Sequence, residues 1–307
     1  MLPLFAIIIA GFLAVRFKIL GVNAAHVLHR FVFYFALPLL LFRSLATGKI
    51  AEILNWPYMG AFVASMLVLF GLMYVVARFA LPQHPLYNSF RSFAASYPNT
   101  GYVGLPFLYV VFGPNGLVPA ALTNVLTTVL VLLMIFLLDI QVQKKPNVRL
   151  QIQGAFLKTL RNPAVFAPII GIIFSYFEWQ LPKGVDNFCM QLGNAAIPCA
   201  LFAIGLNLKM GSFFARPLAY STIMAFKLIA HPLLMLGLSL WLGIQREWAI
   251  TGFLLAGMPT GVLTSIFAHR YKAYEVQSDT LIFLTTLFSL ITLSIYLLIV
   301  PLIWGKV

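Results

Sequence analysis

The chain is poor in charge, and above all in negative charge. Only 9 % of its 307 residues are charged, and 7 of them are Asp or Glu. Soluble globular domains carry about 25 % charged residues, so this composition excludes an ordinary soluble domain. Cysteine is almost absent too, since the chain has only Cys189 and Cys199. They lie in one apolar segment without metal-ligand spacing, so we predict packing residues and neither a disulfide nor a zinc site.

Motifs for nucleotide hydrolysis and hydrolase chemistry are missing as well. The chain contains no P-loop, no Gly-x-Ser-x-Gly, no His-Glu-x-x-His and no Rossmann glycine string. His26 and His29 have the i, i+3 spacing of a metal-binding pair, but they come without a third ligand. We therefore predict no metal, no other cofactor and no enzymatic activity.

Hydrophobic residues dominate what is present. They make up 62 % of the chain, which includes 28 Phe, and polar residues divide them into stretches long enough to span a bilayer. We predict an all-α polytopic membrane protein with ten transmembrane helices near residues 2–19, 27–47, 57–80, 89–111, 115–138, 163–181, 184–207, 217–241, 248–269 and 279–304. No positive segment precedes the first stretch, so it is predicted to span the membrane and not to be a cleaved signal peptide.

Prolines indicate an internal duplication. Pro38 and Pro98 lie 60 residues apart, and Pro198 and Pro259 lie 61 residues apart, each inside a long apolar stretch. The two pairs are therefore offset by 160 to 161 residues. A Leu-Thr-Thr string recurs as well, within residues 126–130 and 284–288. Interrupted helices that recur in two halves are typical of secondary transporters.

Lysine and arginine positions predict the topology. Fourteen of them, Arg91 and Arg216 included, lie in the connections after odd-numbered stretches and four on the other side. The positive-inside rule then places the odd-numbered connections in the cytoplasm and both termini outside, in the periplasm. Because each half holds five helices, the second half enters the membrane as an inverted repeat of the first. The net charge of +13 follows this topology, and we predict no nucleic-acid partner.

The halves meet at one strongly basic loop. We predict a first five-helix repeat over residues 1–140, a basic cytoplasmic linker over residues 141–161 and a second five-helix repeat over residues 162–307. The linker contains Lys144, Lys145, Arg149, Lys158 and Arg161.

The fourth and ninth stretches are predicted to be broken helices. Their centres read Tyr97-Pro98-Asn99-Thr100-Gly101 and Gly257-Met258-Pro259-Thr260-Gly261. Each break exposes the N-terminus of a half-helix, worth roughly +0.5 charge, and two such ends near the midplane would favour an anion. The predicted substrate-binding residues here are Pro98, Asn99, Thr100, Gly101, Pro259, Thr260, Gly261 and Thr264. The alternative is that these prolines are simple kinks.

Lys227 is the second candidate feature. It lies about 15 Å into its stretch at a rise of 1.5 Å per residue, and no Asp or Glu lies at that depth. Its predicted partner is either a substrate carboxylate or the carbonyls freed at the two breaks, and both alternatives stay open. His231, one turn further on, is a candidate for coupling or gating together with Pro38 and Pro198, with local packing as its alternative. Arg43 is expected to snorkel to the outer surface.

Four motifs together point to a family. They are the string from Ser96 to Pro106, Ala36-Leu37-Pro38, Lys227 with Pro232, and residues 257–261. In these the chain resembles the auxin efflux carrier family in its short bacterial form. The resemblance implies a fold similar to sodium and bile acid symporters, in which broken helices 4 and 9 cross at the midplane. It also implies a scaffold of helices 1, 2, 6 and 7, a moving core of helices 3–5 and 8–10, and organic-anion substrates such as auxin or malonate.

The leading hypothesis is a secondary transporter that moves a small organic anion by alternating access at the broken helices. The substrate would be a carboxylate, for example a dicarboxylate or an auxin-like acid. A sodium-coupled symporter and a membrane sensor with a transporter fold are the alternatives, and the coupling ion stays open. The expected partners are the anion, the lipid bilayer and a second copy of the chain in a homodimer through the scaffold. The expected location is the bacterial inner membrane.

Overall fold

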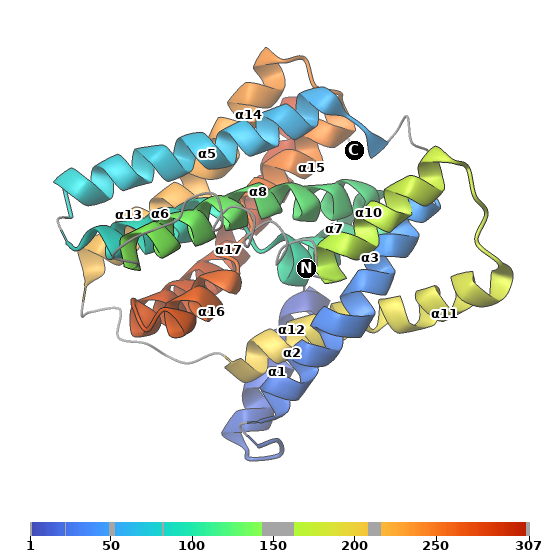
Figure 1. The fold of residues 1–307 in the computed structure, drawn as a ribbon, viewed down its shortest axis with the longest axis horizontal. Helices are drawn as coiled ribbons and strands as arrows, with labels where there is room; N and C mark the ends of the chain where they lie inside the picture. Colours follow the sequence, from blue (N-terminus) through green and yellow to red (C-terminus); the bar gives the residue numbers. More distant parts are fainter. Residues whose placement is uncertain are drawn as a thin grey trace. The chain divides into compact units, whose positions relative to one another are not determined.

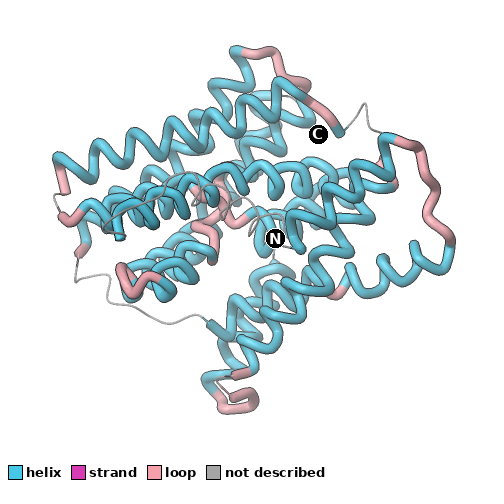
Figure 2. The backbone as a smooth tube through the Cα atoms, viewed as in Figure 1, coloured by secondary structure: helices cyan, strands magenta, loops and turns pink. Residues whose placement is uncertain are grey.

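The part of the chain that the computed structural model describes consists of helices and the loops that connect them, with no strand (Figure 2). It comprises residues 2–21, 23–48, 53–81, 83–142, 163–207 and 216–304. The predicted linker, residues 141–161, therefore lies outside the described residues from residue 143 on. Helices occupy all the apolar stretches named above, although several stretches contain more than one helix.

The helices fall into two compact units, made of residues 1–55, 100–125 and 159–208 and of residues 56–99, 126–158 and 209–307 (Figure 1). The first unit holds α1 (Leu2–Arg16), α2 (Ala24–Phe31), η1 (Val32–Ala36), α3 (Leu37–Ala46), η2 (Thr100–Gly104), α7 (Leu105–Phe112), η3 (Gly113–Gly116), α10 (Pro163–Tyr176), α11 (Lys183–Asn194) and α12 (Ala196–Asn207). The second holds α5 (Trp56–Phe79), α6 (Pro85–Ser96), α13 (Pro217–Ala225), η5 (Phe226–Ala230), α14 (His231–Trp241), α15 (Arg246–Ala256), α16 (Leu263–Arg270) and α17 (Glu275–Trp304). The helix α8 (Leu117–Val142) contributes its residues up to Val125 to the first unit and the rest to the second.

In the first unit, α1 packs along α12, and α3 packs along α10 and α11. Gly11 and Gly205 make the first of these contacts possible, because a Cβ on either would overlap a backbone carbonyl of the facing helix. Arg43, which was predicted to snorkel, forms an ion pair: its Nε donates to Asp186 Oδ1 at 2.6 Å and its Nη2 to Asp186 Oδ2 at 3.1 Å. This ion pair joins α3 to α11, and the snorkelling of Arg43 stays a prediction.

In the second unit, α5 packs along α6, and α14 packs against both α5 and α15 (Figure 1). The contact surfaces are apolar and buried, with Tyr58, Phe62, Met66 and Phe253 among the fully covered side chains. Burial of such side chains gives roughly 1.5–3 kcal/mol each in water. Inside a membrane, a side chain that moves from lipid into a helix contact gains no such hydrophobic free energy. Close packing and hydrogen bonds must therefore hold the helices together.

Three prolines lie two residues after the end of a π-helical turn: Pro38 after η1, Pro106 after η2 and Pro232 after η5. Proline cannot donate to the carbonyl four residues back, and its ring collides with that carbonyl. A wider π turn moves the carbonyl aside, so the helix can continue. The predicted interruption at Pro38 is therefore a π turn within one continuous helix over Ala24–Ala46. At Pro198 the interruption is a turn of one residue, Ala195, between α11 and α12.

Six helices of the described part are long and apolar enough to cross a membrane: Ala24–Ala46, Trp56–Phe79, Thr100–Val142, Lys183–Leu206, Pro217–Trp241 and Glu275–Ile303. Two shorter apolar helices lie at Ala6–Arg16 and Pro163–Tyr176. Large apolar side chains such as Leu72, Ile295 and Leu298 are exposed on these helices, as a lipid environment allows. The protein is thus a multi-pass, all-helical membrane protein, while the number of ten spans stays a prediction.

Candidate functional site

Two helices of the second unit stop at the predicted positions. The helix α6 ends at Ser96, and Tyr97 takes an extended conformation with φ −91° and ψ 104°. The helix α15 ends at Ala256, and helical structure resumes only at Leu263. Proline explains both ends, since Pro98 and Pro259 lack an N–H and disfavour a helical conformation in the residue before them.

The two interrupted segments pair with each other. The backbone N–H of Asn99 donates to Pro259 O at 2.8 Å, and that of Gly261 donates to Tyr97 O at 3.0 Å. Pro98 and Thr260 thereby form one antiparallel bridge. Gly261 is required here, because a Cβ at this position would overlap the ring of Tyr97. The backbone groups that leave the helices are therefore satisfied by each other, as an apolar surrounding demands.

Thr260 satisfies a carbonyl that Pro98 leaves without a donor. Pro98 has no N–H to donate to Ala94 O, four residues back, and Thr260 Oγ1 donates to that carbonyl at 2.8 Å instead. The N–H of Thr260 donates in turn to Thr285 Oγ1 at 3.1 Å. The hydroxyl proton of Thr260 is thus donated to a carbonyl of the protein itself.

Lys227 lies in the π turn η5, fully buried, and its ammonium group donates to Ala256 O at 2.7 Å. Its Nζ also lies 2.9 Å from Nδ1 of His231, whose Nε2 lies 3.3 Å from Ser65 Oγ. Of the two predicted partners, the structure therefore contains a carbonyl at the end of α15. No carboxylate forms an ion pair with Lys227 within the described ranges.

Thr264 is the predicted site residue whose polar atom is left without a partner. It is fully buried in the first turn of α16, and its Oγ1 makes no hydrogen bond. A buried hydroxyl without a partner costs about 1–3 kcal/mol, so a ligand oxygen that accepted from it would recover that cost.

The other predicted residues lie in the first unit. Thr100 Oγ1 donates to Asn124 Oδ1 at 3.2 Å, and Asn124 Nδ2 donates to Ala164 O at 3.3 Å. Gly101 lies against the same amide, because a Cβ there would come within 3.1 Å of Asn124 Oδ1. Pro38 is buried within α3, and Pro198 lines an apolar cavity of about 610 Å³.

Three residues that serve these breaks were not predicted to do so. Thr285 accepts from the Thr260 N–H, Asn124 holds Thr100, and the Tyr296 hydroxyl donates to Leu228 O. Pro232 explains the last bond, since it leaves the Leu228 carbonyl without its helical donor. A sequence signal existed only for Thr285, whose Leu-Thr-Thr string recurs in both halves.

The combination of apolar spanning helices with paired helix breaks and a buried lysine is that of a membrane transport protein. The chain belongs to the family described as "Membrane transport protein", whose model matches residues 1–297. The predicted resemblance to auxin efflux carriers is thereby confirmed at the level of the family, and the chain is not an enzyme.

Curated relatives agree with this assignment. A "Putative malonate transporter" of Rhizobium meliloti (strain 1021) is 27 % identical over 298 residues, which cover 95 % of this chain and 92 % of the relative. The "Uncharacterized transporter YfdV" of Escherichia coli (strain K12) is 24 % identical over 289 residues, 89 % of this chain and 88 % of the relative. "Auxin efflux carrier component 6" of Arabidopsis thaliana is 27 % identical over 151 residues, 46 % of this chain and 26 % of the relative.

Proposed function

We propose that the protein is a secondary transporter that moves a small organic anion by alternating access at the paired breaks of residues 97–99 and 257–262. The observation that carries this proposal is the buried Lys227, which donates to the carbonyl at the end of α15 and has no carboxylate partner in the described part of the chain. When Lys227 is protonated, its charge is compensated by a carbonyl dipole and not by an opposite charge. An anion at this place would supply the missing charge.

One further feature favours an anion. The hydroxyl of Thr264, in the first turn of α16, is fully buried and has no partner. It is a hydrogen-bond donor, and carboxylate oxygens are acceptors only. We propose Pro98, Asn99, Pro259, Thr260, Gly261 and Thr264 as the substrate site, with Lys227 as the residue that fixes the break and supplies positive charge. Thr100 and Gly101 continue the same break on the chain and are proposed with them.

The printed name of the Rhizobium relative suggests which anion to test first. It is a putative malonate transporter, so we propose a carboxylate of that size, a dicarboxylate or an auxin-like acid. A membrane potential that is negative inside favours exit of an anion by about 2.3 kcal/mol per charge per 100 mV. Export thus needs no coupling ion, whereas uptake needs one. Flux measured with and without sodium separates these two modes.

The finer architecture is part of the proposal. We propose ten spans in two inverted repeats, broken helices 4 and 9 that cross near the midplane, both termini in the periplasm and a location in the bacterial inner membrane. Helices 1, 2, 6 and 7 would form the scaffold, through which two copies would associate, and helices 3–5 and 8–10 the moving core. Pro38, Pro198 and His231 are proposed for gating or coupling.

Cysteine labelling tests this topology. In a background without Cys189 and Cys199, a cysteine at Gln245, which is exposed in the same connection as Gly243, should react with an impermeant reagent added outside, and a cysteine at Lys272 should not. The reverse pattern would refute the proposed orientation.

Thr264→Val tests the site itself. The change removes a hydroxyl that has no partner, so the melting temperature should stay equal or rise. Malonate flux in proteoliposomes should fall by roughly threefold to tenfold, the factor that corresponds to a lost hydrogen bond of about 0.5–1.5 kcal/mol. Thr222→Val is the matched control, because its exposed hydroxyl donates only within its own helix, to Leu218 O. Unchanged flux of malonate and of other carboxylates in Thr264→Val would place the site elsewhere.

A further inference from the structure

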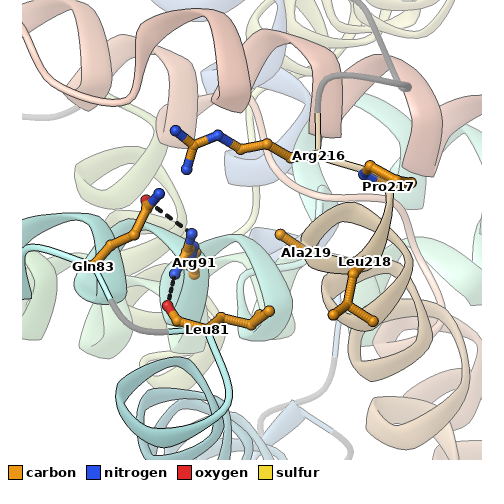
Figure 3. Close-up of a pocket in the computed structure, with 7 residues that line it drawn as sticks. All are labelled: Leu81, Gln83, Arg91, Arg216, Pro217, Leu218 and Ala219. Carbon is orange, nitrogen blue, oxygen red and sulfur yellow. Dashed lines mark hydrogen bonds between the residues drawn. The ribbon is translucent and has the colours of Figure 1, made fainter.

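The second unit contains a cavity that lies apart from the residues proposed to bind substrate. Its volume is about 260 Å³, and its walls are Leu81 and Gln83 from the α5–α6 connection, Arg91 from α6, and Arg216 with the first turn of α13 (Figure 3). Topology prediction assigned Arg91 and Arg216 to two cytoplasmic connections. Arg91 instead lies within α6 and is only 2 % exposed.

Arg91 has hydrogen bonds but no counter-charge. Nη1 donates to Leu81 O at 2.5 Å and to Asn88 Oδ1 at 3.4 Å, and Nη2 donates to Gln83 Oε1 at 2.9 Å. All three acceptors are neutral, and Nε is buried without a partner. A guanidinium group is always charged in proteins, so its burial without an anion carries a large cost.

Arg216 brings a second positive charge to the same cavity. It is half-buried at the start of α13, and Figure 3 shows its side chain reaching over the cavity toward Gln83 and Arg91. Neither arginine forms an ion pair with a carboxylate of the described residues. Burial raises the pKa of Tyr274 to about 12, while the guanidinium groups of Arg91 and Arg216 both act to lower it. Both charges therefore lie close to this one hydroxyl.

The start of α13 adds backbone donors. The helix begins with Pro217, which has no N–H, and the N–H groups of Leu218 and Ala219 in its first turn have no helical acceptor among the described residues. Both residues line the cavity. Two guanidinium groups and a helix N-terminus thus meet at one cavity, and the walls contribute no negative charge.

We propose that this arginine cavity, formed by Leu81, Gln83, Arg91 and residues 216–219, binds a phosphate oxyanion. Three sets of donors line the cavity: the guanidinium groups of Arg91 and Arg216 and the N–H groups in the first turn of α13. A tetrahedral phosphate offers a separate oxygen to each set, whereas a carboxylate has two oxygens in one plane. The phosphate can belong to a lipid headgroup, because the cavity lies at the start of the span Pro217–Trp241, or to a free phosphate compound. The proposal uses none of the residues proposed for transport and does not depend on them.

The test is phosphate binding by the purified full-length protein. Inorganic phosphate, titrated at constant ionic strength, reports the free form, and dioctanoyl phosphatidylglycerol reports the headgroup form. Dioctanoylglycerol, which has the same acyl chains without phosphate, is the lipid control. Arg216→Gln should weaken binding of the phosphate ligand at least roughly tenfold, since it removes a charge-assisted hydrogen bond. Because Arg216 is half-buried, this variant should fold.

Arg78→Gln is the matched control, because Arg78 is an exposed arginine of the same unit outside the cavity. It should bind phosphate like the parent protein. If the parent protein binds inorganic phosphate and Arg216→Gln does not, the result supports a free phosphate ligand. If the parent protein binds only the phospholipid and Arg216→Gln does not, the result supports a lipid headgroup. If the parent protein binds neither ligand, or if Arg216→Gln binds as well as Arg78→Gln, the proposal is overturned.

Discussion

Replacement of Lys227 by methionine tests whether this lysine holds the break of α15 in place. Methionine has a similar length and no donor, so the change removes the 2.7 Å hydrogen bond from Nζ to Ala256 O and little volume. In a regular helix Ala256 O would accept from the N–H four residues on. That N–H belongs to Thr260 and already donates to Thr285 Oγ1. No helical donor can therefore replace Lys227.

The expected cost is that of a buried carbonyl without a partner, about 1–3 kcal/mol. For domains of 150–250 residues, 1 kcal/mol corresponds to about 2–4 °C, so we expect the melting temperature without substrate to fall by roughly 2–12 °C. Removal of a buried ammonium group acts in the opposite direction, because its desolvation cost disappears. The sign of the change thus decides which of the two terms is larger.

Thermal unfolding of the purified variant in detergent, without and with malonate, is the measurement. Lys183→Met is the control, since Lys183 is exposed at the start of α11. An unchanged or higher melting temperature in Lys227→Met would refute the argument that this lysine stabilises the break. If malonate affinity fell while the melting temperature stayed unchanged, Lys227 would act as a ligand of the substrate only.

Two further changes test the packing described above. Tyr296→Phe should destabilise the protein by about 1–3 kcal/mol, because Leu228 O loses its donor. The loss of stability should be smaller in a Pro232→Ala background, where residue 232 regains an N–H for that carbonyl, and equal losses in both backgrounds in a thermal-unfolding cycle would contradict this. Gly205→Ala should lower the yield of folded protein in size-exclusion chromatography, because its Cβ would overlap Ile8 O of α1. Gly237→Ala, which has open space around the new Cβ, should not lower it, and equal yields of the two variants would show that α1 and α12 can move apart.

Helix breaks could be predicted from the sequence because proline acts locally. Pro98 and Pro259 lack the N–H that a helix needs, and polar residues around them need a polar surrounding, so both positions were visible in the chain itself. The effect of Pro38 was predicted less well. Whether proline breaks a helix or is taken up by a π turn depends on what packs around the helix, and the π turn η1 leaves no residue pattern of its own.

The bonds that close the breaks could not be predicted, because they join residues far apart in the chain. Thr260 reaches Ala94 across 166 positions, and the separation between Tyr296 and Leu228 is 68. Arg91 shows the same limit in another way. Its charge suggested a place in a cytoplasmic connection, but three oxygens from the α5–α6 connection and from α6 allow it to be buried.

The hydrogen bonds around the breaks also bear on the choice between an anion and a sodium ion. Sodium prefers oxygen ligands, and a broken helix usually offers it free carbonyls. Here five carbonyls near the breaks already accept hydrogen bonds, those of Ala94, Tyr97, Leu228, Ala256 and Pro259. The donor that is left over is the hydroxyl of Thr264, and Lys227 donates to Ala256 O without an opposite charge among the described residues. A cation would meet the charge of a protonated Lys227 and carbonyls that already accept, whereas an anion would meet a hydroxyl that still lacks an acceptor. This balance of donors over acceptors favours an organic anion as the ligand of the breaks, and any coupling ion would then need a site elsewhere in the protein.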